Sequence, residues 1–160
     1  MQLESMAREL GALLKEKEQT IAVSESSAGG LVSAALLAQA GASKYFMGGG
    51  VIYTGPVRKV FLDLPTRLPA AVRSSSEPYA ALAAETIRAK LRATWGLCET
   101  GAAGPGGNSY GDAAGHTCIA VAGPVTAMTT LETAEANREK NMWLFAQAAL
   151  DELLRCVRES

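Results

Sequence analysis

The charged residues of this 160-residue chain are distributed unevenly, and that distribution most constrains its fold. Seven lie within residues 1–19 and ten within residues 132–160, whereas the 32 residues from Thr100 to Leu131 contain only Asp112. Surface helices expose charges on one face, whereas strands covered on both faces carry almost none. The distribution therefore predicts helices at both ends of the chain and buried strands with tight loops in its middle.

Length and net charge limit the classes of protein that this chain can represent. A chain of 160 residues suits one domain, and at this size a hydrophobic core is stable without disulfides or metal. Its formal net charge of −1 provides no positive field to attract nucleic acid or an acidic membrane surface. The uncharged stretches 26–43 and 113–131 are too rich in small residues, or interrupted by Gly-Pro, to span a membrane. We expect neither nucleic acid nor a membrane as a partner.

The cysteines and the N-terminus indicate the compartment. Cys98, Cys118 and Cys156 are an odd number at wide spacings, which is typical of free thiols in a reducing environment. The first ten residues are partly acidic and have no apolar core, unlike a secretory signal. With a single histidine, the chain has no set of metal ligands. These features predict a cytoplasmic protein without a metal or other cofactor.

Hydrophobic periodicity and turn residues predict ten elements in the order α-β-α-β-α-α-β-β-β-α. The helices are expected at residues 3–18, 31–39, 56–62, 77–94 and 138–156, and the strands at residues 20–24, 47–54, 96–100, 117–122 and 126–131. Strands separated by helices imply a sheet covered on both faces, and the adjacent late strands imply that it is mixed. We expect an α/β fold, a three-layer α/β/α sandwich with a mixed sheet, as one domain over residues 1–160.

Two polar segments follow predicted strands. Residues 24–30, Ser-Glu-Ser-Ser-Ala-Gly-Gly, join a strand to a helix, where open α/β sheets usually bind ligands. An ordinary helix cap with closely packed glycines explains the same segment equally well. Residues 100–109 are rich in Gly and Pro and could cradle an anion, but they match neither a dinucleotide fingerprint nor a P-loop.

Basic residues mark two further candidate positions. Tyr53 at a strand end, followed by Arg58 and Lys59, could bind phosphate or activate a nucleophile, although solvated surface charge is the commoner explanation. Arg138, in the first turn of the last helix, could bind an anion or be incidental. His116 has no Ser or Cys placed to form a recognisable triad, so we interpret it as structural or exposed.

Five motifs carry a resemblance to a known family. They are Ser24-Glu-Ser26-Ser27-Ala-Gly29-Gly30, Gly41-Ala-Ser43-Lys-Tyr-Phe46, Val51-Ile-Tyr53, Ser76-Glu-Pro78 and Thr100-Gly-Ala-Ala-Gly-Pro105. In order and spacing they resemble the C-terminal domain of the competence/damage-inducible CinA family, over residues 5–155. This domain also stands alone as nicotinamide mononucleotide deamidase. The resemblance implies a homo-oligomeric α/β amidohydrolase that converts this nucleotide and water to nicotinic acid mononucleotide and ammonia without a metal.

The resemblance also implies roles for individual residues. Ser26 matches the serine of the family turn and is expected as the nucleophile, with Ser43 and Ser27 as alternatives. Since no histidine is usable, the base is expected to be a lysine whose pKa is lowered by burial. Tyr53 is expected among the catalytic residues, at the nicotinamide or ribose. The expected substrate- and phosphate-binding residues are Ser27, Arg58 and Thr100, the backbone donors Gly29, Gly30, Gly101 and Gly104, and Arg138 at the phosphate.

Three departures from the family pattern bear on activity. Ser27-Ala28 replaces Cys-Thr in the turn, and Asp112-Ala-Ala-Gly-His116 replaces Lys-Pro-Val-Gly-Thr. The family sequence Tyr-Ser-Asn-x-x-Lys places its lysine at position 58, where this chain has Arg58. Arginine stays protonated and cannot act as a base, so Lys59 is the expected substitute. A non-catalytic nucleotide-binding paralogue and an amidase for another small carboxamide remain as alternative functions.

Overall fold

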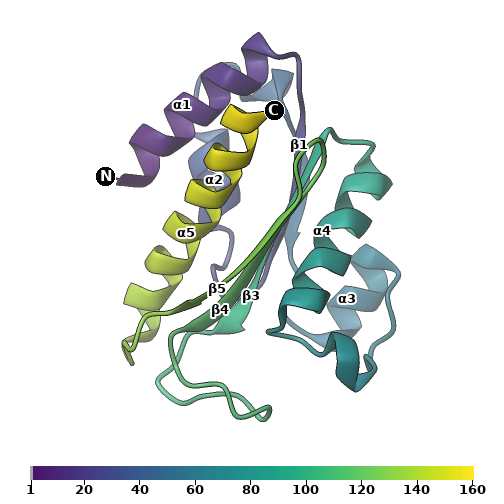
Figure 1. Ribbon diagram of the computed structural model, residues 1–160, viewed down its shortest axis with the longest axis vertical. Helices are drawn as coiled ribbons and strands as arrows, with labels where there is room; N and C mark the ends of the chain where they lie inside the picture. The colour runs from purple at the N-terminus through teal and green to yellow at the C-terminus, as the bar shows by residue number, and fades with distance from the viewer. Residues whose placement is uncertain (1) are drawn as a thin grey trace.

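Five strands form one mixed sheet, and helices cover both of its faces in the computed structural model, which describes residues 2–160 (Figure 1). The sheet has the order β2-β1-β3-β4-β5, in which β2, β1 and β3 are parallel and β3, β4 and β5 are antiparallel. The strands are β1 (Ile21–Glu25), β2 (Phe46–Val51), β3 (Trp95–Ala102), β4 (His116–Ala122) and β5 (Ala127–Glu132). The helices are α1 (Gln2–Glu16), α2 (Leu31–Leu37), α3 (Gly55–Leu62), α4 (Glu77–Leu91) and α5 (Arg138–Glu159). The expected three-layer α/β/α sandwich with a mixed sheet is confirmed.

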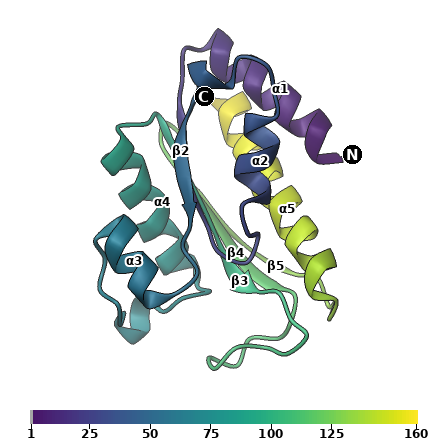
Figure 2. The same cartoon turned by 180° about the vertical axis from the view of Figure 1, so that it is seen from behind.

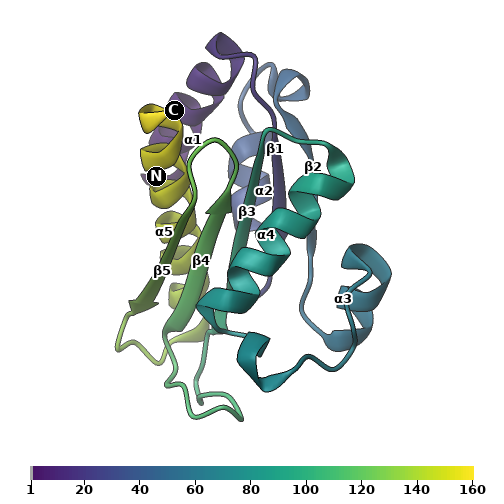
Figure 3. The ribbon, with the colours of Figure 1, turned by 45° about the vertical axis from the view of Figure 1, so that its right-hand side comes forward.

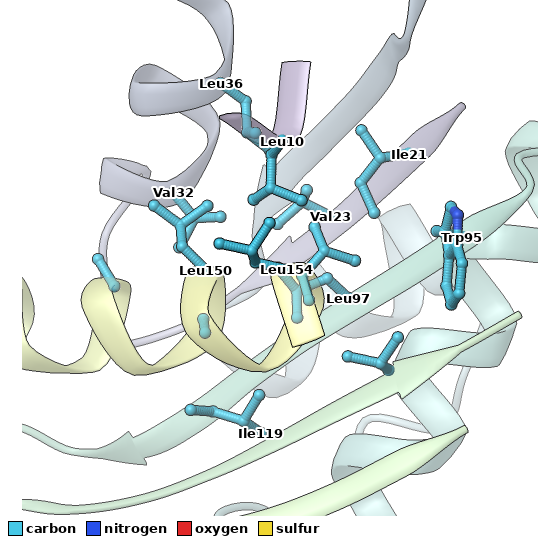
Figure 4. Close-up of a cluster of buried hydrophobic side chains, with 14 of the residues drawn as sticks. Leu10, Ile21, Val23, Val32, Leu36, Trp95, Leu97, Ile119, Leu150 and Leu154 are labelled. Carbon is cyan, nitrogen blue, oxygen red and sulfur yellow. The ribbon is translucent and has the colours of Figure 1, made fainter. Parts of the chain in front are cut away.

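Alternation along the central strands separates the two halves of the core. Val23, Leu97 and Ile119 point to the face covered by α1, α2 and α5, where they meet leucines from those helices (Figures 2 and 4). Ala22 and Cys98, their neighbours along the strands, belong to the other half of the core, beneath α3 and α4. The aliphatic half is the larger, and the alanine-rich half lets α4 lie close to the sheet.

Glycine permits this close approach at one position in particular. A Cβ atom at Gly96 would lie 2.0 Å from the carbonyl oxygen of Ala84 in α4, which no side chain tolerates. Gly96 therefore allows β3 and α4 to pack closely against each other.

Helix caps match the sequence prediction, whereas some element ends do not. The side chains of Ser76 and Asn137 accept hydrogen bonds from the third residue beyond each, as N-caps do. Strand β3 continues two residues past the predicted end, because its pairing with β4 extends to His116. Two short 3₁₀ helices, Ala42–Lys44 and Ala70–Val72, were not predicted.

Cys98, Cys118 and Cys156 are buried free thiols. No helix within residues 2–160 is long and apolar enough to cross a membrane.

Three loops lie together at the carboxyl ends of the parallel strands. Because β1, β2 and β3 run in the same direction, the segments after Glu25, Val51 and Ala102 all leave the sheet at the same end. The long β3–β4 loop projects there, beside the segment that joins α3 to α4 (Figure 3). Open α/β sheets usually bind ligands at the carboxyl ends of their strands, so we expect a ligand site there.

Two adjacent leucines of α2 test the placement of the core. Leu36 is fully buried, whereas Leu37 is 55% exposed. We expect Leu36→Ala to lower the free energy of unfolding by about 3 kcal/mol, through lost burial and the cavity left behind. Leu37→Ala carries the same change in helix propensity and should cost less than about 1 kcal/mol in urea unfolding. Equal losses for the two variants would contradict the placement of α2.

Candidate active site

A two-lobed cavity opens at the carboxyl ends of β1, β2 and β3. The inner lobe, of about 130 Å³, is lined by Ser26, Ile52, Tyr53, Arg58, Ser74, Ser75, Tyr79, Thr100 and Gly101. The basic lobe, of about 540 Å³, is lined by Tyr53, Gly55, Arg58, Thr66, Arg67, Leu68, Ala70, Arg73, Ser74 and Tyr110. Tyr53, Arg58 and Ser74 line both lobes and therefore mark their junction. The structure thus brings together Ser26, Tyr53, Arg58, Thr100 and Gly101 of the predicted site residues.

A buried glutamate holds the turn between β1 and α2. Glu25 accepts hydrogen bonds from the backbone N–H groups of Gly30 (3.1 Å), Val32 (2.9 Å) and Ser33 (2.9 Å), and from the Ser33 hydroxyl (2.7 Å). The carboxylate thereby satisfies the free N–H groups at the start of α2. The Gly29 N–H donates to the Ser26 carbonyl oxygen at 3.0 Å. The N–H groups of both glycines are therefore engaged within the turn, and the structure does not direct them to a ligand.

A second buried glutamate fixes the same turn from β3. Glu99 accepts from the backbone N–H groups of Ser26 (3.0 Å) and Ala28 (2.8 Å), and from the hydroxyls of Ser27 (2.6 Å) and Thr117 (2.9 Å). Burial raises the pKa of the Glu99 carboxyl, and these four hydrogen bonds oppose that shift. Ser27 is buried and lines neither lobe, so it supports the turn.

Ser26 lines the inner lobe. The residue is partly exposed, and its Oγ makes no hydrogen bond to any side chain or backbone group of residues 2–160. Thr100 and Gly101, at the end of β3, line the same lobe. The position suits a nucleophile or a hydroxyl that binds a polar ligand group, as expected for Ser26.

Arg58 is the buried cation of the cavity, with 7% of its surface exposed. Its Nε donates to Tyr79 Oη (3.3 Å), Nη1 to the Thr66 carbonyl oxygen (3.1 Å) and Nη2 to Ser74 Oγ (2.6 Å). The guanidinium also lies over the Tyr79 ring, 4.9 Å from its centroid. All these partners are neutral, and no carboxylate within residues 2–160 forms an ion pair with Arg58. A buried cation without a counterion is a strong site for an anionic ligand group.

Lys59 and Ser43 lie away from this cavity. The Lys59 ammonium is bound to Asp63 at 2.8 Å, and its side chain is 58% exposed. Consecutive side chains on a helix point about 100° apart, so turning Arg58 inward turns Lys59 outward. Ser43 is exposed in the 3₁₀ helix before β2, and therefore lies at the amino-terminal end of that strand, away from the cavity at the carboxyl ends. The structure therefore brings neither the expected base nor this alternative nucleophile to Ser26.

Arg138 braces the rim of the cavity. Its Nη2 donates to Tyr53 Oη at 2.9 Å and its Nη1 to the Gly104 carbonyl oxygen at 2.5 Å. These bonds join the start of α5 to the segment after β2 and to the β3–β4 loop. Arg138 and Gly104 line neither lobe, so they hold Tyr53 and the loop in place.

His116 supports the cavity from behind. Its Nδ1 lies 2.5 Å from Glu132 Oε1 and its Nε2 lies 2.8 Å from the Ser75 carbonyl oxygen. Both ring nitrogens face oxygen acceptors, an arrangement that favours the doubly protonated ring. Burial alone lowers the pKa of His116, but Glu132 and the Ser75 carbonyl outweigh burial and raise the pKa above its ordinary value. His116 lines neither lobe and is buried, with 6% of its surface exposed.

The histidine holds a strained residue of the cavity wall. Ser75 adopts φ 59°, in the left-handed region that non-glycine residues rarely occupy. Its N–H donates to Thr100 Oγ1 at 3.1 Å and its carbonyl accepts from His116. Adjacent Ser74 accepts the hydrogen bond from Arg58, so His116 helps to position the group that orients the guanidinium.

Several residues of the site have little or no signal in the sequence. Glu99 is a charged residue inside an apolar strand, which is a usable sign of a buried carboxylate. Ser74, Arg73 and Tyr110 lie in segments with no distinguishing pattern, and Tyr79 lies in a predicted helix that gives no sign of a site; only the folded chain brings the four to the cavity. Within residues 2–160, no three His, Cys, Asp or Glu side chains gather as metal ligands.

The raised pKa of His116 predicts a pH dependence of stability. The imidazolium is favoured in the folded state, so its contribution is complete below the unfolded pKa of about 6.5 and is lost as pH rises through the folded pKa. We expect the unfolding free energy of the native chain, minus that of His116→Gln, to fall between pH 6 and pH 9 in urea titrations. Because the chain has one histidine, NMR titration assigns the pKa directly. A difference that stays constant over this range would contradict the charged histidine.

Comparisons with known proteins agree with this architecture. The model of the CinA C-terminal domain matches residues 3–157. Among curated relatives, a CinA-like protein from Synechocystis sp. is 32% identical over 98% of this chain and 38% of its own length. A CinA-like protein from Gloeobacter violaceus is 35% identical over 95% of this chain and 36% of its own length. The chain thus spans little more than a third of the length of these relatives.

Solved structures share the fold at lower identity. The competence/damage inducible protein CihA from Agrobacterium tumefaciens has a TM-score of 0.90 at 24% identity, covering 98% of this chain and 96% of its own. A CinA superfamily protein from Escherichia coli has a TM-score of 0.88 at 23% identity, covering 96% and 89%. With the family model matched over nearly the whole chain, and relatives above 30% identity, this protein belongs to the CinA C-terminal domain family.

Proposed function

We propose that this domain binds nicotinamide mononucleotide at the junction of the two lobes and lacks the base needed to hydrolyse it. The proposal rests on Arg58, which is a buried cation with only neutral partners. This arginine stands where the resemblance to the family places a lysine. The guanidinium is a ligand for the phosphate and cannot take a proton from a serine.

The cavity matches the chemical groups of this nucleotide. The inner lobe provides hydroxyls from Ser26 and Thr100 beside the carboxamide, and the aromatic face of Tyr53 at its mouth. Arg58 lies where the two lobes meet, so a 5′-phosphate placed there leaves the carboxamide in the inner lobe. The ligand then neutralises the buried charge, which favours binding.

Hydrolysis requires a proton acceptor beside the serine. Attack by Ser26 Oγ on the carboxamide carbon transfers the hydroxyl proton to a base, which then protonates the leaving ammonia. The residues that line the inner lobe include no Lys, His, Asp or Glu. Glu99 lies nearby, but each of its oxygens already accepts two hydrogen bonds. Three of the four come from the turn and the fourth comes from Thr117.

A second candidate function is the family deamidation with Ser26 as nucleophile. Ser26 favours it, because this serine lines the inner lobe and its hydroxyl makes no hydrogen bond within residues 2–160. Hydrolysis of another small carboxamide belongs to the same candidate. Assembly into a homo-oligomer stays a prediction.

Restoring an amine at position 58 tests the missing base. We expect the native protein to release no more ammonia from nicotinamide mononucleotide than Ser26→Ala does. Arg58→Lys should raise the rate at least about tenfold, because a positioned general base contributes about 100-fold or more. The double variant Arg58→Lys, Ser26→Ala should lose that gain. Release by the native protein that Ser26→Ala abolishes would establish deamidation instead.

Binding of the nucleotide tests the role of the guanidinium. Arg58→Met removes a charge-assisted bond worth about 1.5–3 kcal/mol, so we expect 10- to 100-fold weaker binding by calorimetry. Lys59→Met is the matched control, because it removes the same charge from the neighbouring exposed residue and should leave affinity unchanged. Thermal unfolding of both variants checks the fold, and equal affinities for the two would exclude Arg58 as the phosphate ligand.

A further inference from the structure

The basic lobe extends beyond the place of the phosphate at Arg58. Cavities that hold a whole small ligand usually measure about 300–1,000 Å³. The basic lobe alone reaches about 540 Å³, and the inner lobe adds about 130 Å³ beyond the shared wall of Tyr53, Arg58 and Ser74. If the head group occupies the inner lobe and the first phosphate sits at Arg58, most of the basic lobe is left for a further part of the ligand.

The remaining wall of this lobe carries positive charge. Arg67 and Arg73 line it together with Arg58, and no acidic residue does. Arg73 is paired with Asp112 in a bidentate arrangement, at 2.7 and 3.2 Å, which neutralises its charge. Arg58 and the exposed Arg67 are left as two cations, which equals the two negative charges of a pyrophosphate diester.

An exposed aromatic residue lines the same lobe. Tyr110 is 51% exposed, and the Arg73 guanidinium lies over its ring, 4.9 Å from the ring centroid. The loop is held by Asp112, which pairs with Arg73 and accepts from Asn108 Nδ2 at 2.8 Å. The Tyr110 N–H donates to Asn108 Oδ1 at 3.0 Å. A ring with one face fixed by an arginine and the rest open is a platform on which an aromatic base can stack.

We infer that the basic lobe binds a second nucleotide unit, so that the ligand class of this site is a dinucleotide joined by a pyrophosphate. The second phosphate meets Arg67 beside Arg58, and the second base stacks on Tyr110. This inference rests on the proposed function, because it continues the same ligand outward from the phosphate at Arg58. It assigns a role to Arg67, Arg73 and Tyr110, which the deamidation chemistry does not use.

Calorimetry with two probes tests the inference on the native chain. We compare nicotinamide mononucleotide with nicotinamide adenine dinucleotide and expect the dinucleotide to bind at least tenfold more tightly. Tyr110→Ala should reduce this affinity ratio to near one, whereas Tyr110→Phe keeps the ring and should keep the ratio. Met128→Ala is the control for nonspecific effects, because Met128 on β5 is about as exposed as Tyr110 and lines neither lobe.

Each outcome decides between the two proposals. Equal affinities for the two probes would overturn the dinucleotide inference and leave the proposed function standing. A ratio unchanged by Tyr110→Ala would overturn the role of Tyr110 and with it the second base site. Tight binding of the dinucleotide alone supports the inference and removes the mononucleotide as ligand. Failure of both probes to bind overturns the proposed function and the inference together.

Discussion

The site depends on the hydrogen bonds that two buried carboxylates make to one turn. Burying a carboxylate costs several kcal/mol unless donors replace its lost water. Glu25 and Glu99 each meet that requirement by accepting from backbone N–H groups and hydroxyls of residues 26–33. The same bonds join β3 to the β1–α2 turn and hold the Ser26 backbone still. A hydroxyl carried by a turn bound on both sides is pre-organised for a ligand.

The identity of residue 58 decides the chemistry that this pre-organised hydroxyl can perform. A buried lysine can lose its proton and act as a base, whereas a guanidinium keeps its charge under all physiological conditions. Arg58 is bound by Tyr79, Thr66 and Ser74, which fix its planar group without neutralising it. Position 58 of this chain therefore holds a fixed positive charge, which can bind an anion but cannot accept a proton.

The wall of the cavity depends on a histidine far from Ser26 in sequence and outside the cavity. His116 holds the strained backbone of Ser75, whose other bond goes to Thr100, and the adjacent Ser74 orients Arg58. This series of contacts runs from Glu132 at the sheet edge to the guanidinium. These contacts accommodate the buried ring of His116 behind the cavity wall.

The sequence by itself determined the layers, the mixed sheet and the end of the strands at which the candidate site lies. Periodicity and caps are local properties, and the direction of three parallel strands follows from the helices between them. The resemblance to the family, together with motifs at or just beyond predicted strand ends, also named Ser26, Tyr53, Arg58, Thr100 and Gly101 as candidates, and all five line the cavity. Only the tertiary structure decided that Arg58 faces inward while Lys59 pairs with Asp63 in solvent. The same holds for Gly29, Gly30 and Ser27, whose polar groups serve the turn, and for Tyr110 and Arg73, which come from different loops. Hydrogen-bond partners distant in sequence make these choices, and no local pattern records them.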